Sequence, residues 1–178
     1  MKTILQVEDD PNDVFFLQKA MTKLGVINPI QVVSDGQEAI DYLKGSGRFF
    51  DRSLFPFPCL VLLDLKLPFV MGLEVLKWIR AQPWPALPVL MLSASAEDAD
   101  IAASYRLGAN AFLRKPSEAR QLEEMVKAIR DFWLTHNALP LQTRIEGMVS
   151  AASLRSLGGE PLAANVIEGT ASHIGARR

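Results

Sequence analysis

A continuous apolar run in the middle of the chain ends in a single carboxylate. Residues 60–63 are Leu-Val-Leu-Leu, Asp64 follows them, and a turn begins at Pro68. Strands without polar alternation are typical of parallel sheets that helices cover on both faces. Ligands and reacting groups collect at the carboxyl ends of such strands. Asp64 is therefore the first candidate for a reactive residue, although taken alone it fits a solvated loop aspartate equally well.

Other polar groups stand directly after further apolar runs. They are Glu8, Asp9 and Asp10 after residues 3–7, Ser93 after residues 89–92, and Lys115 after residues 111–113. Crowded carboxylates raise one another's pKa unless a positive charge lies among them. Oxygen ligands of this kind suit Mg²⁺, and Lys115 adds a fixed positive charge. Such a site is suited to neutralising a phosphoryl group that is transferred onto an oxygen of Asp64.

The elements that would position these groups alternate along the chain. Short apolar runs predict strands at residues 3–7, 30–33, 60–64, 89–92 and 111–113. Helical spacing of apolar residues predicts helices at residues 11–24, 37–44, 72–80, 95–107 and 117–134. Ser95 is the expected start of the fourth helix, with Glu97, Asp98 and Asp100 in its first turn. This alternation predicts an α/β fold, a flavodoxin-like doubly wound five-stranded parallel sheet with helices on both faces.

The composition suits one globular domain and excludes several classes of protein. Of the 178 residues, 49% are hydrophobic and 22% are charged, which allows a sizeable core. The net charge of −1 does not favour nucleic acid or an anionic membrane surface. No apolar run is long enough to span a bilayer, and the first residues lack the pattern of a signal peptide, so a cytoplasmic location is expected. Cys59 is the only cysteine, which excludes an internal disulfide.

The domain is expected to cover residues 1–134, with a C-terminal tail at 135–178. The tail is rich in glycine and small polar residues and lacks apolar periodicity, so it is expected to be largely disordered, with a partner-bound segment as the alternative. Residues 45–58 form a long loop rich in aromatic residues and proline. Its aromatic side chains are expected to pack on the sheet, although long loops also serve partner binding.

The acids after the first strand, Asp64, Ser93 and the pair Lys115-Pro116 together resemble the receiver domain of bacterial two-component response regulators. The resemblance covers residues 2–134. Residues 7–14, residues 33–39 and the aromatic loop are similar in particular to single-domain regulators that partner phytochrome-type histidine kinases.

The resemblance implies a role for each residue of the site. Asp64 would be the phosphoacceptor and also a Mg²⁺ ligand. Asp9 would be a direct Mg²⁺ ligand, Glu8 a ligand through water, and Lys66 a ligand through its backbone carbonyl, with Asp10 a neighbour only. Lys115 and Ser93 would contact the phosphoryl group, Phe112 would occupy the switch position, and the peptide before Pro116 would be cis. The implied function is a stand-alone receiver, not an enzyme, that takes a phosphoryl group from a histidine kinase and signals through protein contacts.

Two other classes remain as alternatives. A Mg²⁺-dependent aspartyl-phosphate hydrolase would use a second acid two residues after Asp64, where Lys66 stands. A flavodoxin-like binding module without phosphotransfer would need a phosphate cradle after the first strand, where the acids repel phosphate.

Two surfaces are expected to meet other proteins. Phe15 and Lys19 lie four residues apart on the outer face of the first helix and are expected to dock the kinase. Phe132 lies at the edge of the buried stripe of the last helix and Leu134 on its other side. These two residues predict a homodimer, with a monomer covered by its own tail as the alternative.

Overall fold

The structure, a computed structural model, describes residues 2–84, 87–94 and 97–138. Five parallel strands form one sheet in the order β2-β1-β3-β4-β5. The strands are β1 (Thr3–Val7), β2 (Ile30–Val33), β3 (Pro58–Asp64), β4 (Val89–Ser93) and β5 (Ala111–Arg114). The predicted doubly wound parallel sheet is confirmed.

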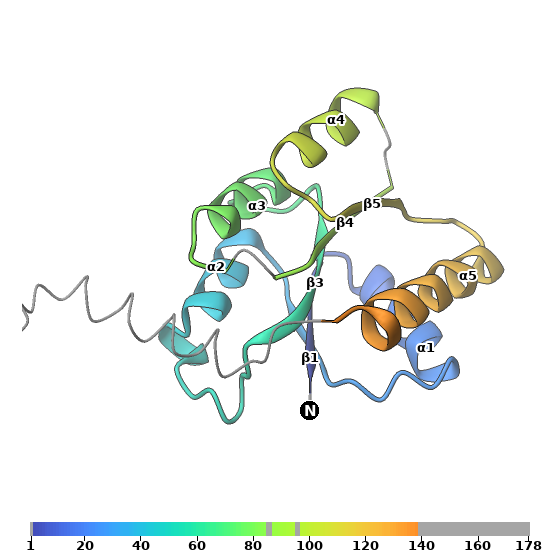
Figure 1. Cartoon of the computed structure of the whole chain (residues 1–178), viewed down its shortest axis with the longest axis horizontal. Coiled ribbons are helices and arrows are strands. Elements are labelled where there is room, and N and C mark those ends of the chain that lie inside the picture. Colours follow the sequence, from blue (N-terminus) through green and yellow to red (C-terminus); the bar gives the residue numbers. More distant parts are fainter. Residues whose placement is uncertain (1, 85–86, 95–96, 139–178) are drawn as a thin grey trace, which may run out of the picture.

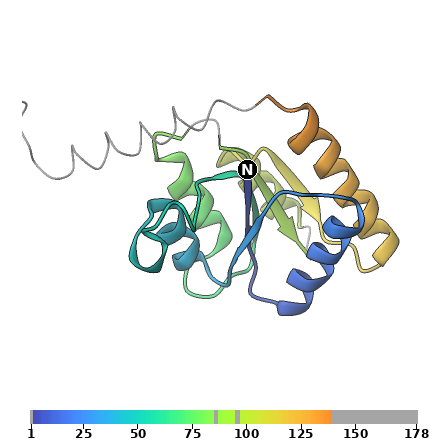
Figure 2. The same cartoon turned by 90° about the horizontal axis from the view of Figure 1, so that it is seen from below.

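Helices cover both faces of this sheet (Figures 1 and 2). They are α1 (Pro11–Lys23), α2 (Gly36–Lys44), α3 (Gly72–Arg80), α4 (Asp98–Arg106) and α5 (Ala119–Ile129). α1 lies beside α5 on one face, and α2 lies beside α3 on the other. Every residue of β3 is buried, because both of its faces meet a helix layer.

The start of α1 is set by its own sequence. The carboxylate of Asp10 accepts a hydrogen bond from the backbone N–H of Asn12 at 2.8 Å, and Pro11 occupies the first helical position. Leu17 and Met21 then face the core, whereas Phe15 is 58% exposed. The predicted buried and outer faces of this helix are therefore confirmed.

Gly72 fixes the course of the chain after Asp64. A Cβ atom at this position would lie 2.1 Å from the backbone oxygen of Asp64, so only glycine allows α3 to begin so close to the end of β3. The N–H of Gly72 also donates to the backbone oxygen of Leu65 at 3.0 Å. Asp64, the candidate phosphoacceptor, is therefore followed by a turn whose path is fixed by close contact and a hydrogen bond.

The aromatic loop after α2 packs largely on the domain. A short 3-10 helix, η1 (Gly47–Phe49), begins it, and the rings of Phe49 and Phe55 contact each other and Tyr42. The guanidinium of Arg52 donates to the carbonyl oxygens of Tyr42 and Leu43 at the end of α2. The expected packing role is confirmed for these rings, whereas Phe50 is 76% exposed.

Two helix ends differ from the sequence-based expectation. α4 begins at Asp98 with Glu97 as its N-cap, and Glu97 makes no side-chain cap hydrogen bond; Ser95 lies outside the described residues. The α-helical part of the last helix ends at Ile129 and continues as a π-helix, η2 (Arg130–His136). Its wider turn is seen in the Asn137 N–H, which donates to the carbonyl oxygen of Phe132, five residues earlier, at 2.7 Å.

The π-helix corrects the expected position of Leu134. This side chain packs partly against the core between α1 and α5, rather than on the opposite side of the helix. The reason is that a π-helix has more residues per turn, so residues after Ile129 are rotated from their α-helical directions. Phe132 remains 56% exposed.

The predicted tail lies almost entirely outside the described part of the chain, which ends at residue 138. Within the described part, no helix has the length and apolar character needed to cross a membrane.

Candidate functional site

The register of the parallel strands brings the polar strand ends to one edge of the sheet. Val7 pairs with Leu63, so Glu8 and Asp64 each follow a paired position. Asp64 pairs with Leu92, which precedes Ser93. Ser93 in turn pairs with the residue before Lys115, and the backbone N–H of Lys115 donates to the carbonyl oxygen of Ser93 at 2.8 Å.

Three carboxylates at this edge are close enough to hold one metal ion. One oxygen each of Glu8, Asp9 and Asp64 lies within 4.8 Å of the other two. Glu8 and Asp64 are buried and Asp9 is exposed, so the cluster opens to solvent on one side. An all-oxygen ligand set suits a hard divalent cation such as Mg²⁺. The side chains present therefore fit the predicted ion.

Asp10 and Lys66, which are close to this cluster in the sequence, make different contacts. The carboxylate of Asp10 caps α1 and is not among the clustered ligands. The backbone N–H of Lys66 donates to Asp64 Oδ2 at 2.8 Å, which holds the Asp64 carboxylate in one orientation. The Lys66 side chain is exposed, and the predicted role of its carbonyl as a metal ligand stays a prediction.

Lys115 reaches the acidic cluster from the end of β5. Its Nζ lies 2.5 Å from Glu8 Oε2, 2.8 Å from Asp64 Oδ1 and 2.8 Å from Asp13 Oδ2. The Lys115 ammonium therefore supplies a positive charge among the crowded carboxylates, as the sequence predicts. It contacts Asp64 Oδ1, whereas the Lys66 N–H donates to the other oxygen, Oδ2.

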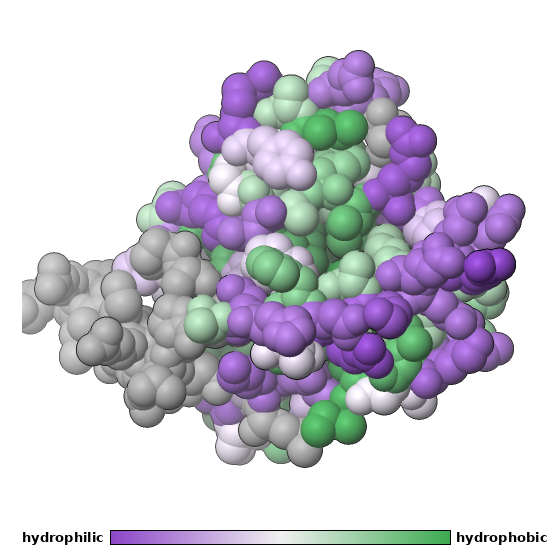
Figure 3. Space-filling view, turned by 45° about the vertical axis from the view of Figure 1, so that its right-hand side comes forward, coloured by the Kyte–Doolittle hydropathy of each residue, from purple (hydrophilic) through white to green (hydrophobic). Residues whose placement is uncertain are grey.

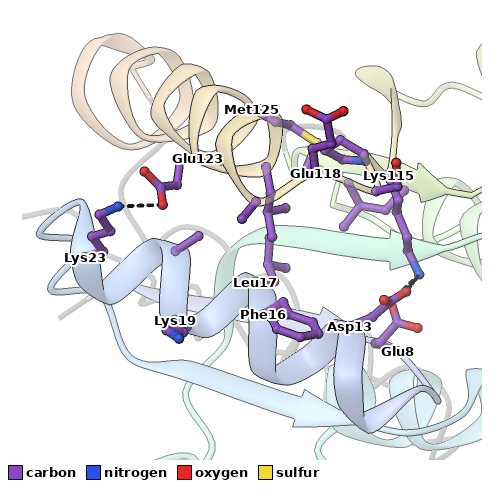
Figure 4. A pocket seen from close by; sticks show the side chains of 16 residues that line it. Glu8, Asp13, Phe16, Leu17, Lys19, Lys23, Lys115, Glu118, Glu123 and Met125 are labelled. Atoms are coloured by element: carbon purple, nitrogen blue, oxygen red, sulfur yellow. Dashed lines mark hydrogen bonds and ion pairs between the residues drawn. The ribbon is translucent and has the colours of Figure 1, made fainter.

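Asp13 is a site residue that sequence reasoning missed. It lies in the first turn of α1, and its carboxylate points at the ammonium of Lys115 (Figure 4). Acids in a first helical turn are common because they favour the helix dipole, so the sequence alone does not distinguish this residue. The available signal was its place three residues after the acids of the strand end.

Burial and pairing act in opposite directions on Glu8. Burial raises the pKa of Glu8 to about 7, although the hydrogen bond and charge of Lys115 oppose that rise. The pKa of Lys115 is also raised, because its hydrogen bonds to Asp13, Asp64 and Glu8 outweigh the effect of burial. Lys115 therefore stays charged near neutral pH, whereas Glu8 changes its charge there.

Ser93 is the last residue of β4, and Phe112 lies on the neighbouring strand β5, where it pairs with Met91. Ser93 is buried, and Phe112 is half-buried against the core of the α2 and α3 face. The backbone N–H of Phe112 donates to the hydroxyl of Tyr105 on α4 at 3.3 Å. The switch position is thereby linked to α4, while the switch itself stays a prediction.

The predicted cis peptide before Pro116 is wrong, because no peptide bond in the described residues is cis. A trans bond is the favoured form for proline peptides as well. Lys115 is positioned by its backbone hydrogen bond to Ser93 and by its carboxylate partners, all of which form with the trans peptide.

A groove of about 520 Å³ lies between α1 and α5 beside this site (Figure 4). Lys115 and Asp13 line one end of it, and the ion pair of Lys23 with Glu123 lies at the other. Phe16 lines the groove and is 52% exposed, and the sequence analysis did not single it out. Phe15, the predicted docking residue, contacts Phe16 edge to face, and the Nζ of Lys19 lies 5.8 Å from the Phe15 ring centre.

Comparison with known proteins supports the resemblance to response regulator receiver domains. The response regulator receiver domain matches residues 4–127. Response regulator Rcp1 of Synechocystis sp. is 35% identical over 140 residues, which cover 78% of this chain and 93% of Rcp1.

Solved structures of such regulators are similar to this one throughout the domain. Phosphorylated RcpA, a cyanobacterial phytochrome response regulator, superposes with a TM-score of 0.72 and is 38% identical, covering 78% of this chain and 98% of RcpA. The Mn²⁺-bound form of Rcp1 gives a TM-score of 0.71 at 35% identity, covering 79% of this chain and 99% of Rcp1. The chain therefore belongs to the response regulator receiver domain family of two-component signalling.

Proposed function

We propose that this receiver accepts a phosphoryl group on Asp64 from a histidine kinase, with Mg²⁺ as cofactor, and signals through protein contacts rather than by turning over a substrate. The observation that carries the proposal is the position of the Asp64 carboxylate. One of its oxygens lies 2.8 Å from the Lys115 ammonium nitrogen. The Asp64 carboxylate also belongs to a cluster of carboxylates that can hold a cation.

The reaction would be an in-line transfer between two side chains. An oxygen of Asp64 attacks the phosphorus of a phosphohistidine, an O–P bond forms, and the P–N bond breaks. The electron pair of the broken bond stays on the imidazole, which takes up a proton and leaves. The product is an acyl phosphate on Asp64.

The chain's own residues would orient the acceptor and offset charge. The Lys66 N–H holds one oxygen of Asp64, and the Lys115 ammonium offsets negative charge on the transferred group. Bound Mg²⁺, held by Asp9 directly, by Glu8 through water and by the Lys66 carbonyl, would neutralise charge between the acceptor and the phosphoryl oxygens. The Ser93 hydroxyl would hydrogen-bond the phosphoryl group once it is in place.

The experiment that tests this function is intact-protein mass spectrometry after incubation with a small phosphodonor. With Mg²⁺ present, the protein is expected to gain the mass of one phosphoryl group. With the metal removed by a chelator, the gain should fall below detection, because the crowded negative charge is then not offset. Equal phosphorylation with and without metal would contradict the proposed role of Mg²⁺.

Phosphorylation is expected to change the face formed by α4, β5 and α5. Ser93 would move toward the phosphoryl group and Phe112 would fill the space behind it, which alters the contact of Phe112 with Tyr105. Figure 3 shows hydrophobic surface between α4 and the hydrophilic band along α5, so this face can present a changed surface to a partner. Backbone NMR shifts across residues 105–112 should change when beryllofluoride binds, and unchanged shifts would contradict the switch.

The kinase, which we propose to be of the phytochrome type, is expected to dock on α1 beside the acidic site. Phe15→Ala should slow transfer from the kinase about tenfold, the order expected when a central aromatic contact of an interface is lost. Phosphorylation by a small donor should be unchanged, since Phe15 lies on the exposed face of α1 and is not one of the clustered carboxylates. The control is Phe50→Ala, which removes an exposed ring of the same kind from the aromatic loop, away from α1. An equal loss with both donors would indicate a folding defect instead of docking.

A homodimer through the end of the last helix is the second proposed association. Phe132 leaves apolar surface exposed at η2, and a twofold pair would bury it. Phe132→Glu should shift the sedimentation coefficient from dimer to monomer at tens of micromolar, because it places a charge in the contact. Phe50→Glu adds the same charge at another exposed phenylalanine and should leave the dimer intact. A wild-type protein that is monomeric at this concentration would exclude the dimer.

A further inference from the structure

We propose that Asp13 is a positioning residue for phosphoryl transfer, which keeps the Lys115 ammonium beside Asp64 when a metal ion occupies the acidic cluster. The inference rests on the proposed function and assigns a part in it to a carboxylate outside the metal cluster.

The contacts of Lys115 single out Asp13. An ammonium group has three N–H donors, and here three carboxylates lie within 2.8 Å of its nitrogen. Glu8 and Asp64 are also members of the cluster that can hold a cation. Asp13 is not among the clustered carboxylates. It lies in the first turn of α1 and lines the groove between α1 and α5, as Lys115 does.

A cation in the cluster would compete with Lys115 for two of its three partners. The oxygens of Glu8 and Asp64 would turn part of their charge to the metal, and two positive charges a few ångströms apart repel each other. The ammonium would then be driven outward. Asp13 is the partner that no metal ion claims, so its attraction to Lys115 remains when the other two weaken.

The exposure of the three side chains is consistent with Asp13 keeping its contact with Lys115 when the contacts of Glu8 and Asp64 weaken. The side chains of Glu8, Lys115 and Asp13 are 3%, 16% and 42% exposed, so the ammonium lies between a buried acid and a partly solvated one. Asp13 therefore holds Lys115 from the solvent side, so that the Lys115 ammonium stays within reach of a phosphoryl group on Asp64. It also links the start of α1 to the segment between β5 and α5 (Figure 4).

Neutralising Asp13 distinguishes positioning from a simple charge effect. Beryllofluoride carries negative charge, so removal of a nearby negative charge by itself should strengthen its binding. Loss of a positioning contact should weaken it. We expect Asp13→Asn to weaken beryllofluoride binding at saturating Mg²⁺ about fivefold, the ratio that corresponds to about 1 kcal/mol for a partly exposed ion pair.

Asp10→Asn is the matched control. It removes the same charge from the same segment, asparagine retains the capping of α1, and Asp10 does not contact Lys115. We expect this variant to bind beryllofluoride as tightly as wild type or more tightly. If Asp13→Asn does the same, Asp13 has no positioning role.

The ammonium signal of Lys115 in ¹⁵N NMR is the second measurement. With Mg²⁺ bound, the wild-type ammonium should be held and give a resolved signal, whereas in Asp13→Asn the signal should be lost to exchange with water. An unchanged signal would overturn the proposal. A wild-type protein that fails to bind beryllofluoride would instead overturn the proposed function, so the two failures are distinguishable.

Discussion

Asp64→Asn is expected to abolish the Mg²⁺-dependent gain of a phosphoryl group. The neutral amide cannot attack phosphorus as a carboxylate does, and the substitution also removes one charge from the metal cluster. The rate should fall below detection, since removal of a covalent nucleophile costs roughly a millionfold in rate. Intact-protein mass spectrometry with a small donor, at matched times, measures it.

Asp10→Asn is the control for this prediction as well. Its carboxylate lies outside the cluster and only caps α1, so phosphorylation should proceed at close to the wild-type rate. A gain of phosphoryl mass by Asp64→Asn equal to that of wild type would mean that another residue is the acceptor. Peptide mapping of the labelled protein would then identify it.

The affinity for Mg²⁺ is expected to rise with pH through neutrality. Burial raises the pKa of Glu8 to about 7, so this carboxyl carries a proton at lower pH and cannot help to hold a cation. Lys115 does not contribute to this change, because its carboxylate partners raise its pKa and it stays charged. Between pH 6 and pH 8 the affinity should increase about tenfold, since one proton must leave before the ion binds. Calorimetric titration at these two values measures the change.

Glu8→Gln identifies the group that titrates. Glutamine has nearly the same size and no proton to lose, so the variant should bind Mg²⁺ more weakly and with a much flatter dependence on pH. A variant with the same tenfold rise would show that the proton comes from another group. In that case the burial of Glu8 would not control metal binding.

Local patterns were sufficient to predict the sheet and most of its helices. Unbroken apolar runs can only be buried on both sides, which predicts covered parallel strands, and β3 is buried along its whole length. Parallel strands place their carboxyl ends at one edge, so the residues just after the runs had to gather there. Glu8, Asp64 and Lys115 could be identified on that basis before any distance was known.

Predictions that depended on helix geometry or on backbone isomers were less successful. The position of Leu134 follows from a π-helical turn, and a regular 3.6-residue period does not predict such a turn. The peptide before Pro116 is trans, which is the favoured isomer of proline peptides, and residue pattern alone does not indicate the isomer. Phe16 borders the groove only because α5 packs beside α1.

The fold class, the edge of the sheet that carries the reactive groups and the chemical types of those groups all follow from local patterns of residues, because these patterns set burial and strand direction. Which charges meet, and how their pKa values shift, depends on the packing of segments that are distant in the sequence. Asp13 and Lys115 are 102 residues apart, and their contact exists because α1 and the end of β5 pack at the same edge. Likewise, the raised pKa of Glu8 comes from the surrounding layers that bury it. Pairing and desolvation act through space, so they appear only when distant segments are brought together.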